Sequence, residues 1–345
     1  MTDLFRTALK AARLLRRRKP LSAALALQEL LTPSPAKPRK KKAARKGATS
    51  KRASSTPKRP APGSISSGEF SCAHGSLTYR LYTPTGSARR RMPLIVMLHG
   101  CSQTADDFAT GTRMSRIADE QGFLVLYPQQ SAAANVARCW NWHDPRNQSR
   151  GKGEPAVIAA LTRHAITLGR ANPARVYIAG ISAGGAAAAI IGAAYPDIYV
   201  AVGVHSAVAR GDIRSLGSAL AAMRGKGGPA PAAKLPRQLP TIVFHGDKDR
   251  IVHASNARGF LANLERSSAG PLVTRSQRGR SERGREYTRR IYQDRSGATL
   301  LEDWTVHDSG HSWSGGSAAV SHTDPTGPDA SREMVRFFLA RRRAG

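Results

Sequence analysis

The sequence predicts an α/β protein with a mostly parallel central sheet covered by helices on both faces, preceded by a basic N-terminal extension. Two observations carry this prediction. Over residues 68–345, short apolar runs alternate with helical patterns, which is typical of parallel strands joined by helices. Residues 1–60 instead hold 18 Lys and Arg against two acidic residues, in a 345-residue chain of net charge +31.

The N-terminal extension has two parts. Residues 1–31 place apolar residues at helical spacing with basic residues on the other side, so we expect a basic amphipathic helical segment interrupted at Pro20. This segment either lies on an anionic surface or partner, or packs on the body of the protein. Residues 32–67 are rich in Pro, Lys, Ser and Ala and predict a disordered linker. The linker either contacts nucleic acid or another polyanion, or is simply solvated.

Residues 68–345 predict a single domain. Uninterrupted apolar runs indicate strands that are covered on both faces. They lie at residues 77–83, 93–100, 123–128, 175–180, 199–207 and 240–246. Helical periodicity predicts helices between them, at residues 106–122, 154–169, 183–196, 213–223 and 255–267. Pro196 ends the helix that begins at residue 183, because proline cannot continue a helical hydrogen-bond ladder.

The C-terminal part predicts a hairpin and a closing helix. Residues 286–294 and 298–308 are joined by a short Gly-containing turn, which indicates an antiparallel hairpin. Residues 328–343 have an amphipathic helical pattern. The basic stretch at residues 275–286 either favours anionic substrates or partners, or forms a solvated loop.

Composition excludes several protein classes. Three cysteines are too few for a disulfide scaffold, and one bridge would indicate an oxidising compartment. No run of 18 apolar residues occurs, so no transmembrane helix is expected. Gln28 and Glu29 interrupt the only apolar stretch near the N-terminus, so a signal peptide is not predicted. No H-E-x-x-H motif or paired Cys/His spacing is present, and we expect no metal or other cofactor.

Residues 180–184, Gly-Ile-Ser-Ala-Gly, match the pattern G-x-S-x-G. The pattern is either a sharp turn that presents a nucleophilic serine, or a set of small residues where a helix packs closely on a sheet. Its place directly after a predicted strand and directly before a predicted helix favours the turn. Ser182 is therefore the candidate nucleophile.

A nucleophilic serine needs a base and a group that orients the base. Asp247 and Asp249 follow the strand at residues 240–246, while His307 and His311 follow the next predicted strand. The order serine, acid, histidine along the carboxyl edge of the sheet is that of α/β-hydrolases. We favour His311, which lies in a Gly/Ser-rich loop, over His307, and both aspartates remain candidates.

The oxyanion of an acyl-transfer intermediate needs backbone N–H donors. One donor is expected at Ala183, directly after the nucleophile. The other is expected in the turn after the strand at residues 93–100, at Cys101 or its neighbour.

Four sequence blocks resemble the poly(3-hydroxybutyrate) depolymerase-type esterases of the α/β-hydrolase superfamily, which are related to feruloyl and acetylxylan esterases. They are PLIVMLHGCSQTADDFATGTRMSRIADEQGFLVLYPQQ, RCWNWHDPRNQSRGKGEPAVIAALT, RVYIAGISAGGAAAAIIGAAYPDIYVAVGVHSA and the region from GHSWSGG to the final helix. The resemblance covers about residues 70–340. It implies Ser182 as nucleophile, His311 as base and, through the pattern HG-x-x-D-x-x-V, Asp249 as acid.

The resemblance also implies roles around the nucleophile. Cys101 and Ala183 become the oxyanion donors, and a Cys101–Cys139 disulfide that rigidifies the oxyanion turn is a hypothesis based on the family. Three tryptophans become candidate substrate-binding residues, with loop packing as an equal alternative for the first two; they are Trp140, Trp142 and Trp313.

These observations predict a serine carboxylesterase that hydrolyses poly(3-hydroxybutyrate) or its oligomers through an acyl-enzyme. The first alternative is a feruloyl, acetylxylan or general short-acyl esterase. The second is a polyanion- or nucleic-acid-binding protein that acts through residues 1–60. We expect no polymer-binding domain after the final helix, and the basic tail stands where many relatives have a signal peptide. The family is often secreted, whereas the tail favours a cytoplasmic or granule-associated protein.

Overall fold

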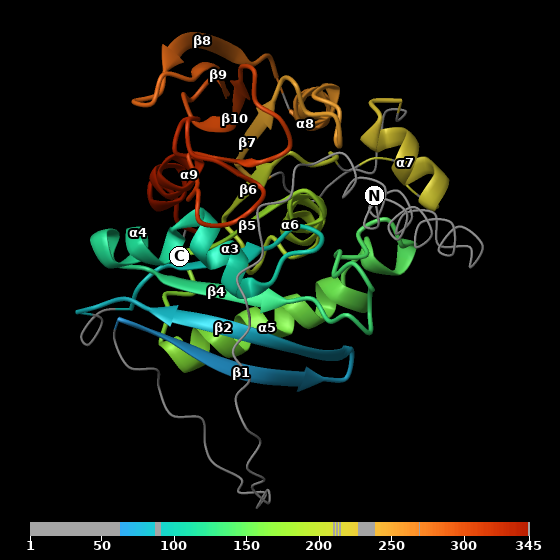
Figure 1. Ribbon diagram of the computed structural model, residues 1–345, viewed down its shortest axis with the longest axis vertical. Coiled ribbons are helices and arrows are strands. Elements are labelled where there is room, and N and C mark those ends of the chain that lie inside the picture. Colours follow the sequence, from blue (N-terminus) through green and yellow to red (C-terminus); the bar gives the residue numbers. More distant parts are fainter. Residues whose placement is uncertain are drawn as a thin grey trace, which may run out of the picture. The chain divides into compact units, whose positions relative to one another are not determined.

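The computed structural model describes residues 63–86, 91–209, 211, 213, 215–226, 239–268 and 270–343. Within these residues, ten strands form one sheet in the order β1-β2-β4-β3-β5-β6-β7-β10-β9-β8 (Figure 1). The six central strands are parallel, and an antiparallel pair flanks them at each edge. The predicted alternation of strands and helices is therefore present. The predicted segment 1–31 and most of the predicted linker lie outside the described residues.

The six central strands are β3 (Leu94–Leu98), β4 (Leu124–Gln129), β5 (Val176–Ile181), β6 (Ala201–His205), β7 (Thr241–Gly246) and β10 (Thr299–Val306). Five of the six central strands are predicted apolar runs, and the sixth, β10, is the second strand of the predicted hairpin. The predicted run at residues 77–83 forms β2 (Gly75–Thr83), which is antiparallel to its central neighbour. All residues of β3, β5 and β6 are buried, as expected for strands with helices on both faces. Their carboxyl ends share one edge of the sheet, and the candidate site residues follow these ends.

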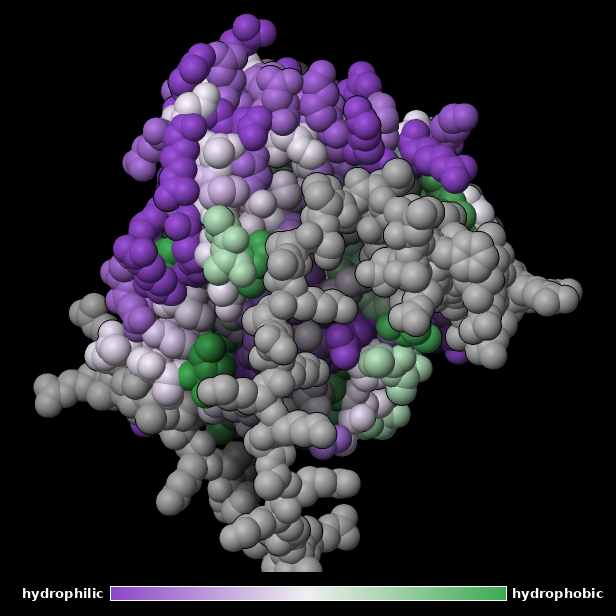
Figure 2. All heavy atoms as spheres, in the orientation of Figure 1, coloured by the Kyte–Doolittle hydropathy of each residue, from purple (hydrophilic) through white to green (hydrophobic). Residues whose placement is uncertain are grey.

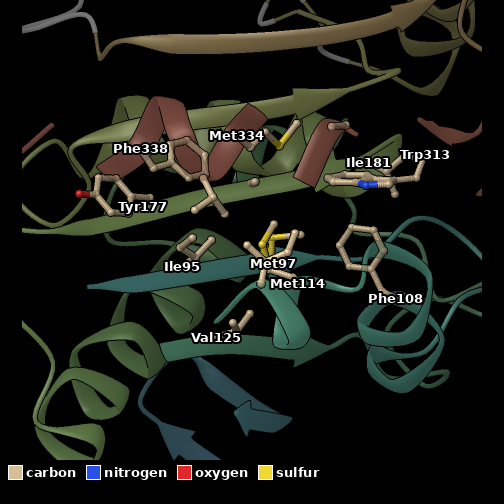
Figure 3. Close-up of a cluster of buried hydrophobic side chains, with 14 of the residues drawn as sticks. Ile95, Met97, Phe108, Met114, Val125, Tyr177, Ile181, Trp313, Met334 and Phe338 are labelled. Atoms are coloured by element: carbon tan, nitrogen blue, oxygen red, sulfur yellow. The ribbon is translucent and has the colours of Figure 1, made fainter. Parts of the chain in front are cut away.

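Helices cover both faces of the sheet (Figure 1). On one face lie α3 (Ala105–Thr112), α4 (Met114–Gln121) and α9 (Ala330–Leu339). On the other lie α5 (Gly153–Gly169), α6 (Ala183–Ala194) and α8 (Ser255–Ser267), while the short α7 (Leu216–Met223) follows β6. Figure 3 shows the core under α9, where Phe338 stacks on Tyr177 with ring centroids 5.0 Å apart. This two-sided burial fixes the strands whose ends carry the site.

The predicted single helix at residues 106–122 is wrong in one respect. Arg113 adopts a left-handed conformation with φ of 53°, which ends α3 and begins α4. A left-handed residue is uncommon outside glycine and is not visible in a periodicity pattern. The break divides the predicted helix into α3 and α4, which both contact β4.

The edge strands correct two further predictions. Ser64–Ser67, assigned above to the end of the linker, form the first half of β1 (Ser64–Cys72), which pairs along its length with β2 (Gly75–Thr83). The alternative of a solvated loop for residues 275–286 is also wrong for most of them. Residues up to 280 belong to β8 (Val273–Arg280), which pairs with β9 (Glu286–Gln293) and carries the hydrophilic surface at the top of Figure 2. Backbone pairing, rather than apolar content, makes both segments strands.

Within the described residues, no helix combines the length and the apolar character needed to cross a bilayer.

Candidate active site

Ser182 lies at the sharp turn between β5 and α6. Its backbone has φ of 57° and ψ of −123°, a conformation that costs a non-glycine residue free energy and that is concentrated at functional sites. The N–H of Ser182 donates to the carbonyl oxygen of His205 at 2.9 Å, and its carbonyl oxygen accepts from Ala186 N–H at 3.0 Å. Bonds to a neighbouring strand and to the following helix therefore hold the strained residue.

Glycines on both sides make this turn possible. A Cβ on Gly180 would lie 2.7 Å from the Leu98 carbonyl oxygen, and one on Gly184 would collide with the carbonyl oxygens of Leu98 and His99. Only residues without a side chain let the turn approach the end of β3 this closely. The sharp turn and the close packing that were weighed as alternatives are thus both present, because the packing of the small residues allows the turn.

The turn after β3 contains the expected oxyanion donor Cys101. His99 holds this turn through both ring nitrogens: Nδ1 donates to the Gly100 carbonyl oxygen at 2.8 Å, and Nε2 accepts from Gln130 N–H at 3.1 Å. Burial lowers the pKa of His99 to about 4, so the ring stays neutral as this arrangement requires. Gly100 N–H donates to the Gln103 side chain at 2.8 Å.

A disulfide joins Cys101 to Cys139 across 38 residues, which is the pairing that the resemblance implies. Next to it, Ser102 N–H donates to the Ala137 carbonyl oxygen at 2.6 Å. The carboxylate of Glu154 holds the rest of this loop, accepting from Asn141 N–H at 2.8 Å and from the Gln130 side chain at 2.6 Å. The loop after β4 is therefore fastened to the oxyanion turn.

Asp249 and His311 are brought together by the loops after β7 and β10. The Nδ1 atom of His311 lies 2.7 Å from Asp249 Oδ2, while Asp249 Oδ1 accepts from the N–H groups of Ile251 and Val252, each at 2.9 Å. Burial alone would raise the pKa of Asp249, but bonds from His245 and His311 outweigh it and hold this pKa well below its ordinary value. The carboxylate is thus ionised and places a proton on His311 Nδ1, which leaves Nε2 free to act as a base.

A second aspartate–histidine pair lies at the same edge of the sheet. Asp247 Oδ2 is 2.9 Å from His307 Nδ1, and Thr288 Oγ1 is 2.9 Å from His307 Nε2. The side chains of Asp247 and His307 are about one third exposed, whereas that of Asp249 is fully buried. Each candidate acid is therefore hydrogen-bonded to one candidate histidine. The Asp249–His311 pair is the more buried of the two pairs.

His205, the last residue of β6, connects the serine turn to the histidine loop. Its carbonyl oxygen accepts from Ser182 N–H, and its Nε2 accepts from Ser314 N–H at 3.0 Å, three residues beyond His311. Burial lowers the pKa of His205 to about 3, so the ring remains an acceptor at neutral pH. His205 thus links the two elements, the serine turn through its backbone carbonyl and the histidine loop through its neutral ring.

The three predicted tryptophans are buried in the structure. Trp140 is fully buried, and its Nε1 donates to the His99 carbonyl oxygen at 3.1 Å. Trp313 is 1% exposed, donates to Ser331 Oγ at 3.0 Å, and stacks on the His205 ring. Trp142 is 6% exposed. Burial of their apolar area, with a hydrogen bond from the indole N–H of Trp140 and of Trp313, fits the packing alternative, while their predicted contact with substrate stays a prediction.

The residues that sequence reasoning missed are buried histidines next to strand ends. His99, His205 and His245 each lie at or beside the carboxyl end of a buried strand, and each hydrogen-bonds with loop backbone. The signal was a histidine followed by Gly or Ser within an apolar run, in LHG, VHS and FHG.

The buried neutral rings predict a stability loss in acid. Because His205 has a pKa of about 3 in the folded protein and about 6.5 when unfolded, only the unfolded chain binds this proton between those values. The free energy of unfolding is therefore unaffected by this group above about pH 6.5. As the pH falls below that value, it decreases by up to about 1.4 kcal/mol per pH unit. His205→Gln should flatten the decline between pH 6 and pH 4.5 relative to wild type, as measured by urea unfolding. His74→Gln, in the exposed β1–β2 turn, is the control. Equal slopes in all three proteins would contradict the assignment.

Comparison with known proteins identifies the family. A family model described as esterase PHB depolymerase matches residues 77–286. Poly(3-hydroxyalkanoate) depolymerase C of Paucimonas lemoignei is 29% identical over 260 residues, which cover 70% of this chain and 60% of that protein. Feruloyl esterase B of Neurospora crassa is 35% identical over 132 residues, which cover 38% of this chain and 44% of that protein. The chain thus spans 60% or less of the length of these two curated relatives.

Solved structures agree on the fold. The acetyl xylan esterase from Aspergillus awamori superposes with a TM-score of 0.61 at 18% identity, covering 72% of this chain and 94% of that one. The predicted α/β-hydrolase fold is confirmed by this similarity and by the sheet described above. The match over residues 77–286, more than half of the chain, shows that the chain belongs to the esterase PHB depolymerase family.

Proposed function

We propose that this protein is a serine carboxylesterase that hydrolyses ester bonds of poly(3-hydroxybutyrate) or its oligomers. The observation that carries the proposal is the strained Ser182, flanked by Gly180 and Gly184, at the sheet edge where Asp249 is hydrogen-bonded to His311. Membership of an esterase family supports it, as does similarity to a protein named as a depolymerase.

In the proposed reaction, Ser182 Oγ attacks the ester carbonyl carbon while His311 Nε2 takes the hydroxyl proton. The N–H groups of Ala183 and Cys101 donate to the oxyanion of the tetrahedral intermediate. Collapse breaks the bond to the leaving alcohol, which receives the proton from His311 and departs, leaving an acyl-enzyme. Water then attacks with His311 again as base, releasing the carboxylic acid and restoring the serine hydroxyl.

Asp249 supports these reaction steps through its negative charge and its hydrogen bonds. Two backbone N–H groups and burial fix its carboxylate, so His311 keeps its Nδ1 proton and its orientation throughout. The positive charge that forms on His311 is stabilised by the adjacent anion. Polyanion contact through residues 1–60 stays a prediction, since those residues lie outside the part of the chain that the structure describes.

Replacing Ser182 by Ala should lower kcat on p-nitrophenyl butyrate by at least about 10³-fold, because the covalent route is lost. A serine-directed phosphonate should label the wild-type protein on the peptide that contains Ser182 and should not label the variant. The control is Ser71→Ala, an exposed serine of β1, which should be labelled and active like wild type. Full turnover by the Ser182 variant would disprove the mechanism.

The two aspartate–histidine pairs allow a matched test of the acid. Asp249→Asn should lower kcat by about 10²–10⁴-fold, because the amide favours the wrong tautomer of His311. Asp247→Asn makes the same chemical change in the exposed pair and should alter kcat by no more than about threefold. Steady-state kinetics of both variants decide the assignment, and a larger loss in the Asp247 variant would reverse it.

The ester class is tested with a panel of substrates. We expect the highest kcat/KM on 3-hydroxybutyrate oligomers, compared with methyl ferulate and acetylated xylo-oligosaccharides, measured by release of acid at constant pH. Because relatives include a protein named feruloyl esterase B, preference for ferulate is the first alternative. Preference for either other ester would refute the proposed substrate while leaving the proposed mechanism intact.

A further inference from the structure

Arg285 lies in the turn between β8 and β9, and its side chain reaches the loop that carries His311. Its Nη1 donates to the carbonyl oxygen of Asp308 at 2.8 Å. Its Nε and Nη2 donate to Thr326 Oγ1 at 3.1 Å and 2.8 Å, and Nη2 lies 3.3 Å from Asp324 Oδ2. The side chain is 24% exposed, compared with 65% for Arg280 in the same hairpin. The guanidinium group of Arg285 is therefore bonded to the protein on all of its nitrogen atoms.

The bond to Asp308 falls on a strained point of the histidine loop, which comprises residues 307–314. Asp308 has φ of 52°, a left-handed conformation that costs a residue other than glycine free energy. Two charged side chains hold this residue from opposite ends. Asp247 Oδ1 accepts from Asp308 N–H at 2.8 Å, and Arg285 donates to its carbonyl oxygen. Both peptide groups of the left-handed residue are thus fixed, three residues before His311.

Asp324 extends the same contact to the next residue of the histidine loop. Its Oδ2 atom accepts from Ser309 Oγ at 3.1 Å and also faces Arg285. Its Oδ1 atom accepts from Thr326 N–H at 2.9 Å, which keeps the two side chains that bind Arg285 next to each other. The side chain of Asp324 is 11% exposed, so its interaction with Arg285 is partly shielded from water.

Arg285 also connects the parts of the loop on the two sides of His311. Its partner Asp324 is the last residue of β12 (Thr323–Asp324), which pairs with β11 (Trp313–Ser314). β11 begins two residues after His311, whereas Asp308 precedes it. One guanidinium group therefore binds the chain before the histidine and the strand that pairs with the chain after it.

We propose that Arg285 is a positioning residue for His311, which keeps the histidine loop where His311 Nδ1 meets Asp249 Oδ2. A planar guanidinium can bond several acceptors in fixed directions at once, which a lysine cannot do. Without it, the left-handed turn at Asp308 loses one of its two restraints, and His311 leaves the geometry in which it accepts a proton. The consequence for catalysis rests on the proposed function, whereas the effect on the bond between His311 and Asp249 does not.

The kinetic test replaces Arg285 by Ala. On p-nitrophenyl butyrate, kcat should fall about tenfold with KM within about twofold of wild type, because a displaced His311 impairs proton transfer rather than ester binding. Guanidinium ion at millimolar concentration should raise kcat of the variant at least about threefold and ammonium ion should not, because only guanidinium can bond Asp308 and Asp324 together. A loss confined to KM, no loss, or equal effects of the two ions would overturn the proposal.

The matched control is Arg280→Ala. It removes an exposed arginine of the same hairpin together with its ion pair to Glu286, without touching the histidine loop. Its kcat should equal that of wild type with and without guanidinium. A loss as large as that of the Arg285 variant would mean that the charge of the hairpin, and not the contact with the loop, affects turnover.

Arg285→Lys decides the question if the Ala variant fails to fold. Lysine keeps the positive charge beside Asp324 but presents a single nitrogen, so kcat should still fall at least about threefold. A kcat equal to that of wild type would refute the positioning role.

A spectroscopic test separates this inference from the proposed function. The Nδ1 proton that His311 shares with Asp249 should give a downfield proton resonance in wild type and in Arg280→Ala, assigned by its loss in His311→Gln. In the Arg285 variants it should broaden or disappear through exchange with water, and an unchanged resonance would contradict the proposal. Ser182→Ala should keep this resonance while losing activity, so a failure of the proposed function is recognised separately.

Discussion

The site depends on one constraint, the close approach of the turn at Ser182 to the end of β3. The turn fits only because Gly180 and Gly184 present no side chain to the carbonyl oxygens of Leu98 and His99. This close contact fixes the position of Ser182 relative to the turn after β3, which contains the expected oxyanion donor. The unfavourable backbone conformation of Ser182 is stabilised by two hydrogen bonds, one to β6 and one to the first turn of α6.

Around this point the protein uses buried neutral histidines as fixed connectors. His99 fastens the oxyanion turn to the end of β4, and His205 fastens the serine turn to the loop after His311. An imidazole with one donor and one acceptor can join two loops that need opposite partners, which a lysine or a carboxylate cannot do. Burial keeps the rings of His99 and His205 uncharged, while the carboxylate hydrogen-bonded to His311 Nδ1 is the ionised Asp249. His99 and His205 thus hold the loops in place without adding a positive charge near Asp249 and His311.

Much of the fold and of the candidate site could be predicted from the sequence. Apolar runs located the central strands, and the order of Ser182, Asp249 and His311 along the chain follows from strands that end at one edge. The missed features share a physical cause, because they depend on backbone pairing or conformation rather than on composition. β1 is rich in Ser and Gly and is a strand because β2 pairs with it, and Arg113 breaks a helix through a dihedral angle. The sequence could not decide between substrate contact and packing for the tryptophans, because an aromatic residue that lines a site and one that packs beside it look alike in a sequence.

The exposed outer strand β8 has a consequence for how copies of this chain meet. Within the described residues β8 pairs with β9 alone, so its other edge presents a row of backbone donors and acceptors to water. A strand of another molecule can pair with such an edge and extend the sheet. Here Arg275, Arg278 and Arg280 line the strand, and an edge-to-edge match between two copies would bring like charges together. The arginines thus oppose the pairing of two copies through the unpaired edge of β8.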